Sequence, residues 1–234
     1  MCGRYTSTTP IADLAVYFHV DEVKIDEEPP ASWNVAPTRN VAAVTTSKDG
    51  DVRRLETMKW GLVPGWAKDP AIGNRMINAR AETLATSNAY RKAFATRRCI
   101  LPADGYYEWL EVAKASPKRT PKRPFYYWSP AGEPLAIGGL WEVWHDAEGR
   151  RLYTCTVVTT APNRLAAKVH DRMPLLLRPA AWDRWLAPEP LNEDEAATLL
   201  VPAEEGAIEA REVTTAVSNV RNDGPQLIEA ASTS

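Results

Sequence analysis

Cysteine is scarce in this chain, and the few cysteines are far apart. Only three occur among 234 residues, at Cys2, Cys99 and Cys155. An odd number at wide spacing supplies neither a disulfide framework nor the paired ligands of a zinc module. The pattern therefore predicts a protein of a reducing compartment.

Histidine is equally scarce, and His19, His145 and His170 are its only occurrences. Three separated histidines without paired cysteines are too few ligands for a multi-histidine metal site. We therefore expect no metal and no other cofactor.

Long apolar segments are also missing. No run approaches the roughly 18 apolar residues that a membrane-spanning helix needs. The beginning, Met-Cys-Gly-Arg-Tyr, lacks the charged and apolar regions of a signal peptide. We expect a cytoplasmic protein with no membrane partner. Because 44% of the residues are hydrophobic and no low-complexity linker interrupts them, residues 1–234 are expected to form a single domain.

Charge is unevenly distributed, although the formal net charge is only −2. Residues 1–180 contain 25 Lys and Arg against 19 Asp and Glu, whereas residues 181–234 contain 3 against 11. A basic body with an acidic end can present a basic groove to phosphates. Charge alone favours the simpler alternative, an ordinary solvated surface with an acidic end.

Seven segments are rich in Val, Thr, Tyr and Trp and are bounded by Gly, Pro, Asp or Lys, which predicts strands. They are 41–45, 52–58, 99–101, 106–112, 125–128, 135–143 and 152–159. Helices are expected after Thr9 and Pro10, with Thr9 as the cap, and near 87–96, 161–168, 180–186 and 192–200. Strands and helices do not alternate regularly, so the fold class is α+β, a single β-rich domain.

Two segments are expected to lie outside this core. Residues 114–123 contain Lys-Arg-Thr-Pro-Lys-Arg and predict an exposed loop between two strands. The last residues, Ala-Ser-Thr-Ser, are expected to be frayed.

Cys2 is the first candidate for chemistry because of its position. Removal of Met1 would leave an α-amine and a thiol on adjacent carbons of Cys2. The amine forms a Schiff base with an aldehyde, and the thiol then closes onto the imine carbon to give a thiazolidine. A free α-amine has a pKa of about 7.7–8.0, so part of it is neutral and nucleophilic at neutral pH. The alternative is that Cys2 is simply the second residue of an ordinary chain.

Glu108 and His170 are candidates for proton transfer. Glu108 follows two tyrosines and precedes Trp109 in a predicted strand, where alternation places Tyr106 and Glu108 on one face and Tyr107 and Trp109 on the other. A carboxyl beside an aromatic wall can act as a general acid or base. His170 follows a short predicted helix, and histidine is the type of side chain that titrates nearest neutrality. An exposed strand glutamate and a histidine at a helix end are the alternatives.

Polar and aromatic residues elsewhere are candidates for binding an amine, a phosphate or the bases of a single strand. Asn78 could orient an amine, and Arg80 could bind phosphate through its planar fork. Trp60 and Trp66 lie in a Gly/Pro-broken stretch that is poorly suited to burying both indoles, and exposed tryptophans near lysines stack bases in single-strand binders. The stretch Trp33-Asn34-Val35-Ala36-Pro37 is similar. A surface turn and ordinary core packing are the alternatives.

The chain resembles the SOS response-associated peptidase (SRAP) family, the abasic-site processing proteins. The resemblance follows the family's order of motifs along nearly the whole chain. The motifs are Met1-Cys2-Gly3-Arg4-Tyr5, Asn34-Val35-Ala36-Pro37, Trp60-Gly61-Leu62-Val63-Pro64, Asn78-Ala79-Arg80, Glu82-Thr83, Ala103-Asp104-Gly105-Tyr106-Tyr107-Glu108-Trp109, His170-Asp171-Arg172-Met173-Pro174 and Val217-Ser218-Asn219-Val220-Arg221-Asn222.

The resemblance implies a barrel-like mixed sheet with short flanking helices and a groove for single-stranded DNA. It implies that Cys2 supplies the amine and thiol, that Asn78 positions the amine, and that Glu108 is the acid/base. It also implies that His170 assists ring opening and reversal. Implied residues of the DNA path are Arg4, Asn34, Pro37, Trp66, Arg80 and Trp109. Ala67 departs from the second tryptophan that can follow Trp66 in bacterial relatives, which puts the detail of base stacking in doubt.

The expected function is therefore covalent capture of abasic sites in single-stranded DNA by Cys2 in the DNA damage response. We expect a monomer that is nucleoid-associated when bound to DNA. One alternative is a cysteine peptidase using Cys2, Glu108 and His170, restricted largely to removal of its own Met1. Another is a non-catalytic reader of modified cytosine in DNA, which would need no free N-terminus.

Overall fold

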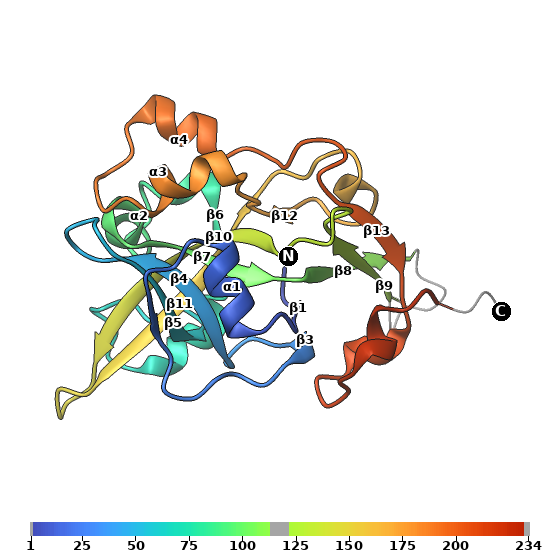
Figure 1. The fold of residues 1–234 in the computed structure, drawn as a ribbon, viewed down its shortest axis with the longest axis horizontal. Coiled ribbons are helices and arrows are strands. Elements are labelled where there is room, and N and C mark those ends of the chain that lie inside the picture. Colours follow the sequence, from blue (N-terminus) through green and yellow to red (C-terminus); the bar gives the residue numbers. More distant parts are fainter. Residues whose placement is uncertain (1, 113–121, 232–234) are drawn as a thin grey trace.

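Five strands close into a barrel in the computed structural model, which describes residues 2–112 and 122–231, and these strands lie in the left half of Figure 1. They are β4 (Asn40–Thr46), β5 (Arg53–Trp60), β7 (Arg98–Ala103), β10 (Leu135–His145) and β11 (Arg151–Thr160). The order β11-β10-β7-β4-β5 is antiparallel throughout, and parallel pairing of β5 with β11 closes the ring. The prediction of a barrel-like mixed sheet in a β-rich domain is confirmed.

Short strands extend the barrel. β2 (Glu22–Lys24) pairs in parallel with β5, while β6 (Asn78–Arg80) and β12 (Met173–Pro174) both pair with β11. A second sheet lies beside the barrel in the order β13-β9-β8-β1-β3. Its strands are β1 (Tyr5–Ser7), β3 (Ser32–Val35), β8 (Gly105–Glu111), β9 (Lys122–Trp128) and β13 (Glu209–Glu212).

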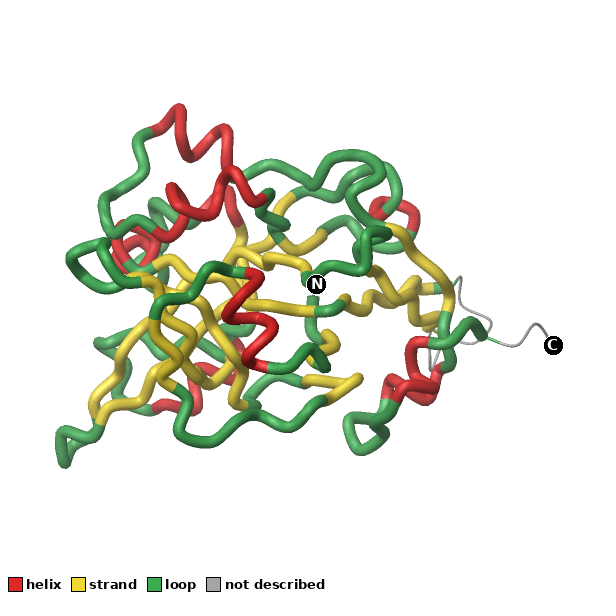
Figure 2. The backbone as a smooth tube through the Cα atoms, viewed as in Figure 1, coloured by secondary structure: helices red, strands yellow, loops and turns green. Residues whose placement is uncertain are grey.

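Helices are short and lie around the strands, as the red segments of Figure 2 show. They are α1 (Ile11–Tyr17), α2 (Arg91–Thr96), α3 (Trp182–Leu186) and α4 (Glu193–Leu199), with several 3-10 turns. Among the described residues, none of the helices is long and apolar enough to cross a bilayer.

Local signals in the sequence located most of these elements. All seven predicted strands are present, and Asn192 with Glu195 forms a capping box that starts α4. The prediction of Thr9 as the cap of α1 is wrong, because its hydroxyl donates to Asp104 instead. The helix expected over 161–168 is reduced to a 3-10 turn, η3 (Ala166–Lys168).

Two expectations fall on residues that lie largely outside the described ones. The loop predicted over 114–123 is described only at Lys122 and Arg123, which belong to β9. Of the last four residues, predicted to be frayed, only Ala231 is described, and its amide donates to the Glu212 carbonyl oxygen at 3.0 Å.

The two faces of the barrel strands bury different clusters of apolar residues. On β7, Cys99 and Leu101 join the cluster that contains Cys2, whereas Ile100 joins the cluster under the helices. This alternation follows from the two-residue period of a strand. The cluster around Cys2 also receives Trp60, whose indole is completely buried. Cys2 therefore lies against the barrel and not on a free arm of the chain.

The chain passes from the barrel to the second sheet between β7 and β8. Asp104 accepts hydrogen bonds from Thr8 and Thr9, whose hydroxyls and backbone amides converge on its carboxylate. Gly105 follows at once and has no space for a side chain, because a Cβ there would overlap the Tyr126 hydroxyl and the Tyr127 carbonyl oxygen. This crossing sets the position of β8 and of Glu108 on it.

Gly105→Ala should therefore lower the free energy of unfolding by about 1–3 kcal/mol, as expected for an added methyl group in a packed site. Urea denaturation of the two proteins measures the change. Gly65→Ala is the control, because a Cβ at Gly65 would meet only the Val143 carbonyl oxygen at 3.8 Å. Equal stability losses in both variants would contradict the packing argument.

Candidate functional site

Residues 2–4 run beside β8 toward Glu108. Tyr5 pairs with Tyr106, and the amide of Tyr107 donates to the Arg4 carbonyl oxygen at 2.9 Å. This pairing places Cys2, which is fully buried, in contact with the cluster around Tyr106. Burial raises the pKa of the Cys2 thiol, and the negative charge of Glu108 raises it further. The thiol is therefore protonated at neutral pH.

Glu108 is buried on the middle of β8, with 3% of its surface exposed. Burial raises the pKa of its carboxyl, and nearby positive charge, including that of His170, opposes the increase only in part. The predicted alternation of β8 is confirmed, because Tyr107 and Trp109 contact each other with ring centroids 6.4 Å apart. Glu108 is therefore not the exposed strand glutamate of the alternative interpretation.

A pair of stacked tyrosines lies on the same side of the second sheet as Glu108. The rings of Tyr106 and Tyr127 stack with centroids 4.8 Å apart and an interplanar angle of 6°. The charge of Glu108 acts on both phenols and, after burial, contributes to the increase in the pKa of each. This aromatic wall keeps water away from the carboxyl.

Asn78 begins β6, where it pairs with Val157 of β11. Its side-chain oxygen and nitrogen are both buried, and neither has a hydrogen-bond partner among the described residues. An unpaired buried amide costs about 1–3 kcal/mol, so the position is suited to a polar group that arrives from outside the fold.

His170 follows the η3 turn, where its amide donates to the Ala166 carbonyl oxygen at 3.0 Å. Its Nδ1 accepts the backbone N–H of Arg172 at 3.0 Å, and the Asp171 carboxylate lies 2.8 Å from the same nitrogen. A protonated ring has the Asp171 carboxylate as its counter-ion. The side chain is 28% exposed, and its charge acts on the buried Glu108.

The structure brings Glu108 within electrostatic range of both Cys2 and His170. Asn78 lies on β6, which pairs with one side of β11. His170 precedes β12, which pairs with the other side of β11 near its end. Their catalytic roles stay predictions. No group of three or more His, Cys, Asp and Glu suited to a metal ion occurs within the described part of the chain.

The residues predicted for the DNA path divide into two groups. Asn34 is 5% exposed, and its amide nitrogen donates to the carbonyl oxygens of Val217, Asn219 and Asn222 at 3.3, 3.1 and 2.7 Å. Arg4 donates to Asn34 Oδ1 at 2.8 Å and lies over the Trp109 ring. We call residues 217–222 the C-terminal strap. Asn34 holds this strap, so its side chain is engaged inside the protein and not open to a ligand.

The second group is accessible. Trp66 is 59% exposed, Arg80 is exposed, and Pro37 is half-buried. Trp60, by contrast, is fully buried in the cluster around Cys2, and its indole N–H donates to the Ile77 carbonyl oxygen. The prediction that the Trp60–Trp66 stretch would leave an indole exposed is therefore confirmed for Trp66. Binding of DNA by these residues stays a prediction.

Sequence reasoning missed a basic segment between β5 and β8. Residues 57–103 contain eight Lys and Arg against two acidic residues. Both acids are engaged, since Asp69 caps the η1 turn (Pro70–Arg75) and Glu82 pairs with Arg172. Five of the cations are exposed and have no carboxylate partner in the described structure: Lys68, Arg75, Arg80, Arg91 and Lys92. A charge count over a shorter window would have found this segment.

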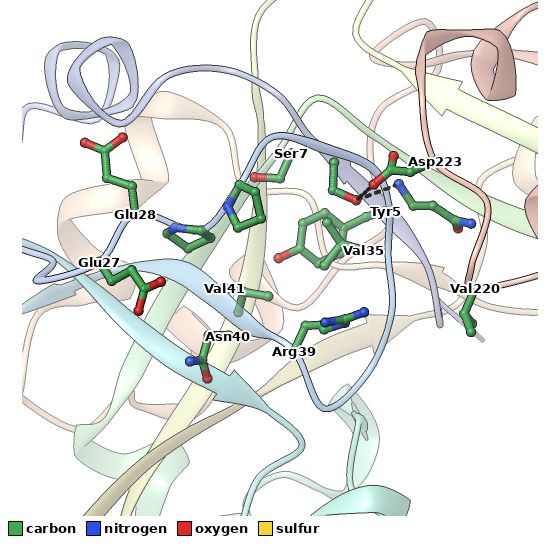
Figure 3. Close-up of a pocket in the computed structure, with 14 residues that line it drawn as sticks. Tyr5, Ser7, Glu27, Glu28, Val35, Arg39, Asn40, Val41, Val220 and Asp223 are labelled. Carbon is green, nitrogen blue, oxygen red and sulfur yellow. Dashed lines mark hydrogen bonds between the residues drawn. The ribbon is translucent and has the colours of Figure 1, made fainter.

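A separate cleft of about 350 Å³ lies between β1, β3 and the loop before β3 (Figure 3). Its lining includes the carboxylates of Glu27, Glu28 and Asp223, and Asp223 accepts from Ser32 and from the Trp33 amide. Cys2, Glu108 and His170 are not in its lining. Its acidic character makes it a poor site for phosphates, so we do not place the reaction there.

Comparison with known proteins confirms the family resemblance. The model of the family described as SOS response associated peptidase (SRAP) matches residues 1–220. Abasic site processing protein YoqW of Bacillus subtilis (strain 168) is 41% identical over 98% of this chain and 99% of its own. Abasic site processing protein YedK of Escherichia coli (strain K12) is 33% identical, again over 98% and 99%. The crystal structure of a protein from Bacteroides thetaiotaomicron is similar in fold alone, with a TM-score of 0.84, 22% identity and coverage of 98% and 100%.

Replacement of Glu108 by Gln should stabilise the fold at neutral pH. Because the pKa of Glu108 is raised above its ordinary value of 4.5, the folded protein retains this proton to higher pH than the unfolded chain does. Stability conferred by the protonated carboxyl is therefore lost as pH rises above that value. Urea denaturation should show Glu108→Gln to be more stable than the parent at pH 7 and nearly equal to it at pH 4.

Glu209→Gln, at an exposed position of β13, serves as the control and should show no such dependence. If the stability advantage of Glu108→Gln over the parent were no larger at pH 7 than at pH 4, burial would not penalise the charged carboxylate.

Proposed function

The chain belongs to the SOS response-associated peptidase (SRAP) family, and we propose that it processes abasic sites in single-stranded DNA by forming a covalent bond with Cys2. The observation that carries the proposal is the burial of Cys2 beside a buried carboxyl, Glu108, at the start of the chain. Names of the curated relatives, YoqW and YedK among them, support abasic sites as the substrate. Removal of Met1, by an aminopeptidase or by the chain itself, must come first.

The proposed reaction proceeds in two bond-forming steps. The neutral amine of Cys2 attacks the aldehyde carbon and gives a carbinolamine, which loses water to become an imine. The Cys2 thiol then adds to the imine carbon, and its proton passes to the nitrogen. One aldehyde and one aminothiol give one thiazolidine and one water. A protonated thiol suits this order, because it does not compete with the amine for the aldehyde.

Glu108 supplies the proton for loss of water from the carbinolamine. A carboxyl with a raised pKa remains protonated often enough to donate near neutral pH. Asn78 has an unpaired amide that could accept a hydrogen bond from the amine and orient it. Both groups act on the same nitrogen.

His170 acts on the sugar. Abasic deoxyribose is mostly ring-closed, so the aldehyde must be released by moving a proton between oxygens. An imidazole that is 28% exposed and within range of Glu108 can exchange protons with solvent and with the site. The same step run backwards would assist reversal of the crosslink.

DNA binding is electrostatic and independent of sequence in this proposal. The exposed cations of residues 57–103 provide phosphate contacts, and Trp66 provides a surface on which a base can stack. Phosphate contacts carry no sequence information, so any abasic site that the strand presents is acceptable.

Cys2→Ala should abolish the stable thiazolidine yet leave some borohydride-trappable Schiff base, because the amine survives. Intact mass after incubation with an abasic oligonucleotide measures both products. Cys99→Ser and Cys155→Ser are the matched controls, since both thiols are equally buried but lie in barrel strands. Acetylation of the N-terminus should prevent both products, whereas a reader of modified cytosine would still bind DNA. Loss of crosslinking in a folded Cys99→Ser variant would refute the assignment.

Glu108→Gln and His170→Ala should fail at different steps. Glu108→Gln keeps the shape and removes the acid, so imine formation should slow by about 10²–10⁴-fold on every substrate. His170→Ala should slow crosslinking on a ring-closed site more than on a pre-opened aldehyde analogue, and should change the reversal rate. Single-turnover gel assays measure these rates. Equal slowing of His170→Ala on both substrates would exclude its ring-opening role.

Arg80→Ala should weaken binding of undamaged single strands of all sequences alike. It should also reduce the slope of log affinity against log salt concentration by about one, which is the contribution of one phosphate contact. Fluorescence anisotropy at several salt concentrations measures both. Arg178→Ala, at an exposed arginine that pairs with Glu204, is the control and should bind as the parent does. A strong preference for one base composition would favour the modified-base reader instead.

A further inference from the structure

The cleft beside β1 and β3 contains a buried hydroxyl that the fold leaves unpaired. Tyr5 is 1% exposed, yet its hydroxyl forms no hydrogen bond with any described residue. By contrast, the Tyr107 hydroxyl on the adjacent strand β8 donates to the Trp33 carbonyl oxygen at 2.8 Å. Tyr5 lines the cleft, and Figure 3 shows its hydroxyl pointing into the space between the lining residues. Because a buried polar group is costly to leave unpaired, this hydroxyl is suited to a ligand.

Two carboxylates of the same cleft are also unpaired. Glu27 and Glu28 line it, are exposed, and form no ion pair with any residue that the structure describes. They precede Pro29 and Pro30, whose rings fix the backbone φ and so restrict the loop between β2 and β3. Asp223, the third carboxylate of the cleft, is already engaged by β3. Two carboxylates and one phenol oxygen can therefore accept hydrogen bonds from a cation with N–H donors.

The acidic surface continues into a neighbouring hollow of about 370 Å³. This hollow shares two lining residues with the cleft, Glu27 and Asn40, and adds two carboxylates, Asp26 and Glu56. Its lining also includes Thr57, whose buried hydroxyl has no partner in the described part of the chain. The lysine in this lining, Lys24, is paired with Glu22 at 3.1 Å. Carboxylates in two adjoining hollows suit a ligand with several positive charges spaced along a chain.

Apolar side chains form part of the walls of the cleft. They are Pro29, Pro30, Val35 and Val41, and alkyl segments between the charges of a ligand would bury apolar surface against them. Arg39 is exposed in the same lining and has no carboxylate partner among the described residues. Figure 3 shows it below the Tyr5 ring and apart from Glu28. Its charge would repel a cation, so the ammonium groups would lie toward the two glutamates.

An extended peptide is a poor occupant of this cleft. β3 lies at one end of the second sheet, where a peptide could pair with a free strand edge. The Trp33 amide, however, donates to the Asp223 carboxylate at 2.7 Å. The next amide, that of Asn34, donates to the Ser32 hydroxyl oxygen at 3.1 Å. These main-chain donors are therefore engaged, whereas a small cation requires only the side-chain acceptors.

We propose that this cleft binds a linear aliphatic polyamine, whose ammonium groups pair with Glu27 and Glu28 and donate a hydrogen bond to the Tyr5 hydroxyl. The longer members of this class reach the neighbouring hollow, where Asp26 and Glu56 hold a further ammonium group. Binding is non-covalent. The proposal does not depend on the reaction at Cys2, which is not part of the lining.

Isothermal titration calorimetry with spermidine tests the site, at about 0.15 M salt so that diffuse attraction between surface charges is screened. The double variant Glu27→Gln/Glu28→Gln should bind about 10- to 100-fold more weakly, because it loses charge-assisted hydrogen bonds. Asp49→Asn/Asp51→Asn is the matched control, since it removes two exposed carboxylates of a different acidic hollow. The control should bind as the parent does. Equal weakening in both double variants, or no binding by the parent, would overturn the proposal.

Tyr5→Phe removes only the hydroxyl. Because this group has no partner in the described structure, the variant should be at least as stable as the parent in urea denaturation. It should nevertheless bind spermidine about 3- to 10-fold more weakly, the effect of one hydrogen bond. Arg39→Gln removes the repelling charge and should bind more tightly than the parent. A Tyr5→Phe variant that loses stability and keeps full affinity would show a purely structural hydroxyl and would overturn the proposal.

A trilysine peptide with an acetylated N-terminus and an amidated C-terminus distinguishes a free polyamine from a basic segment of a protein partner. It carries the same charge as spermidine at neutral pH, but on side chains that branch from a peptide backbone. Spermidine should bind more tightly, because the main-chain donors of β3 are engaged and the backbone gains no partner there. Tighter binding of the peptide than of spermidine would overturn the polyamine assignment.

Discussion

Burial of the Glu108 carboxyl against Cys2 is the constraint on which the site depends. A carboxyl that is 3% exposed favours its neutral form, and an isolated buried charge would be costly. The fold accepts this cost because β8 lies between β1 and β9, with the stacked rings of Tyr106 and Tyr127 beside the carboxyl. Burial therefore raises the pKa of this carboxyl above that of an exposed glutamate.

Support for this carboxyl comes from two directions. On the barrel side, Asp104 gathers Thr8 and Thr9 and so holds β1 beside the start of β8. On the outer side, Asn34 and Arg4 hold the C-terminal strap by its carbonyl oxygens. Residues near both ends of the chain thereby enclose the same strand. This arrangement explains why Asn34 belongs to the Asn34-Val35-Ala36-Pro37 motif although its amide is engaged inside the protein.

The polar groups of the site differ in how they are satisfied. Asn78 has a buried amide with no partner among the described residues, while His170 is held through Arg172, which in turn is held by Glu82 and Thr159. An unsatisfied group is ready for a ligand, whereas a supported ring has its orientation determined in advance. The two properties together are those of a preorganised site.

The sequence by itself determined the longer strands, the two faces of β8 and the capping box of α4, because each depends on neighbours within a few residues. It also placed Cys2 directly after Met1, and the order of its motifs indicated the family. Only the tertiary structure decided that β5 closes on β11, that Glu108 is buried and that Asn34 faces inward. Strands as short as β6 and β12 have too few residues to show a period, and the contacts that set burial join segments far apart in the chain, where local pattern carries no information.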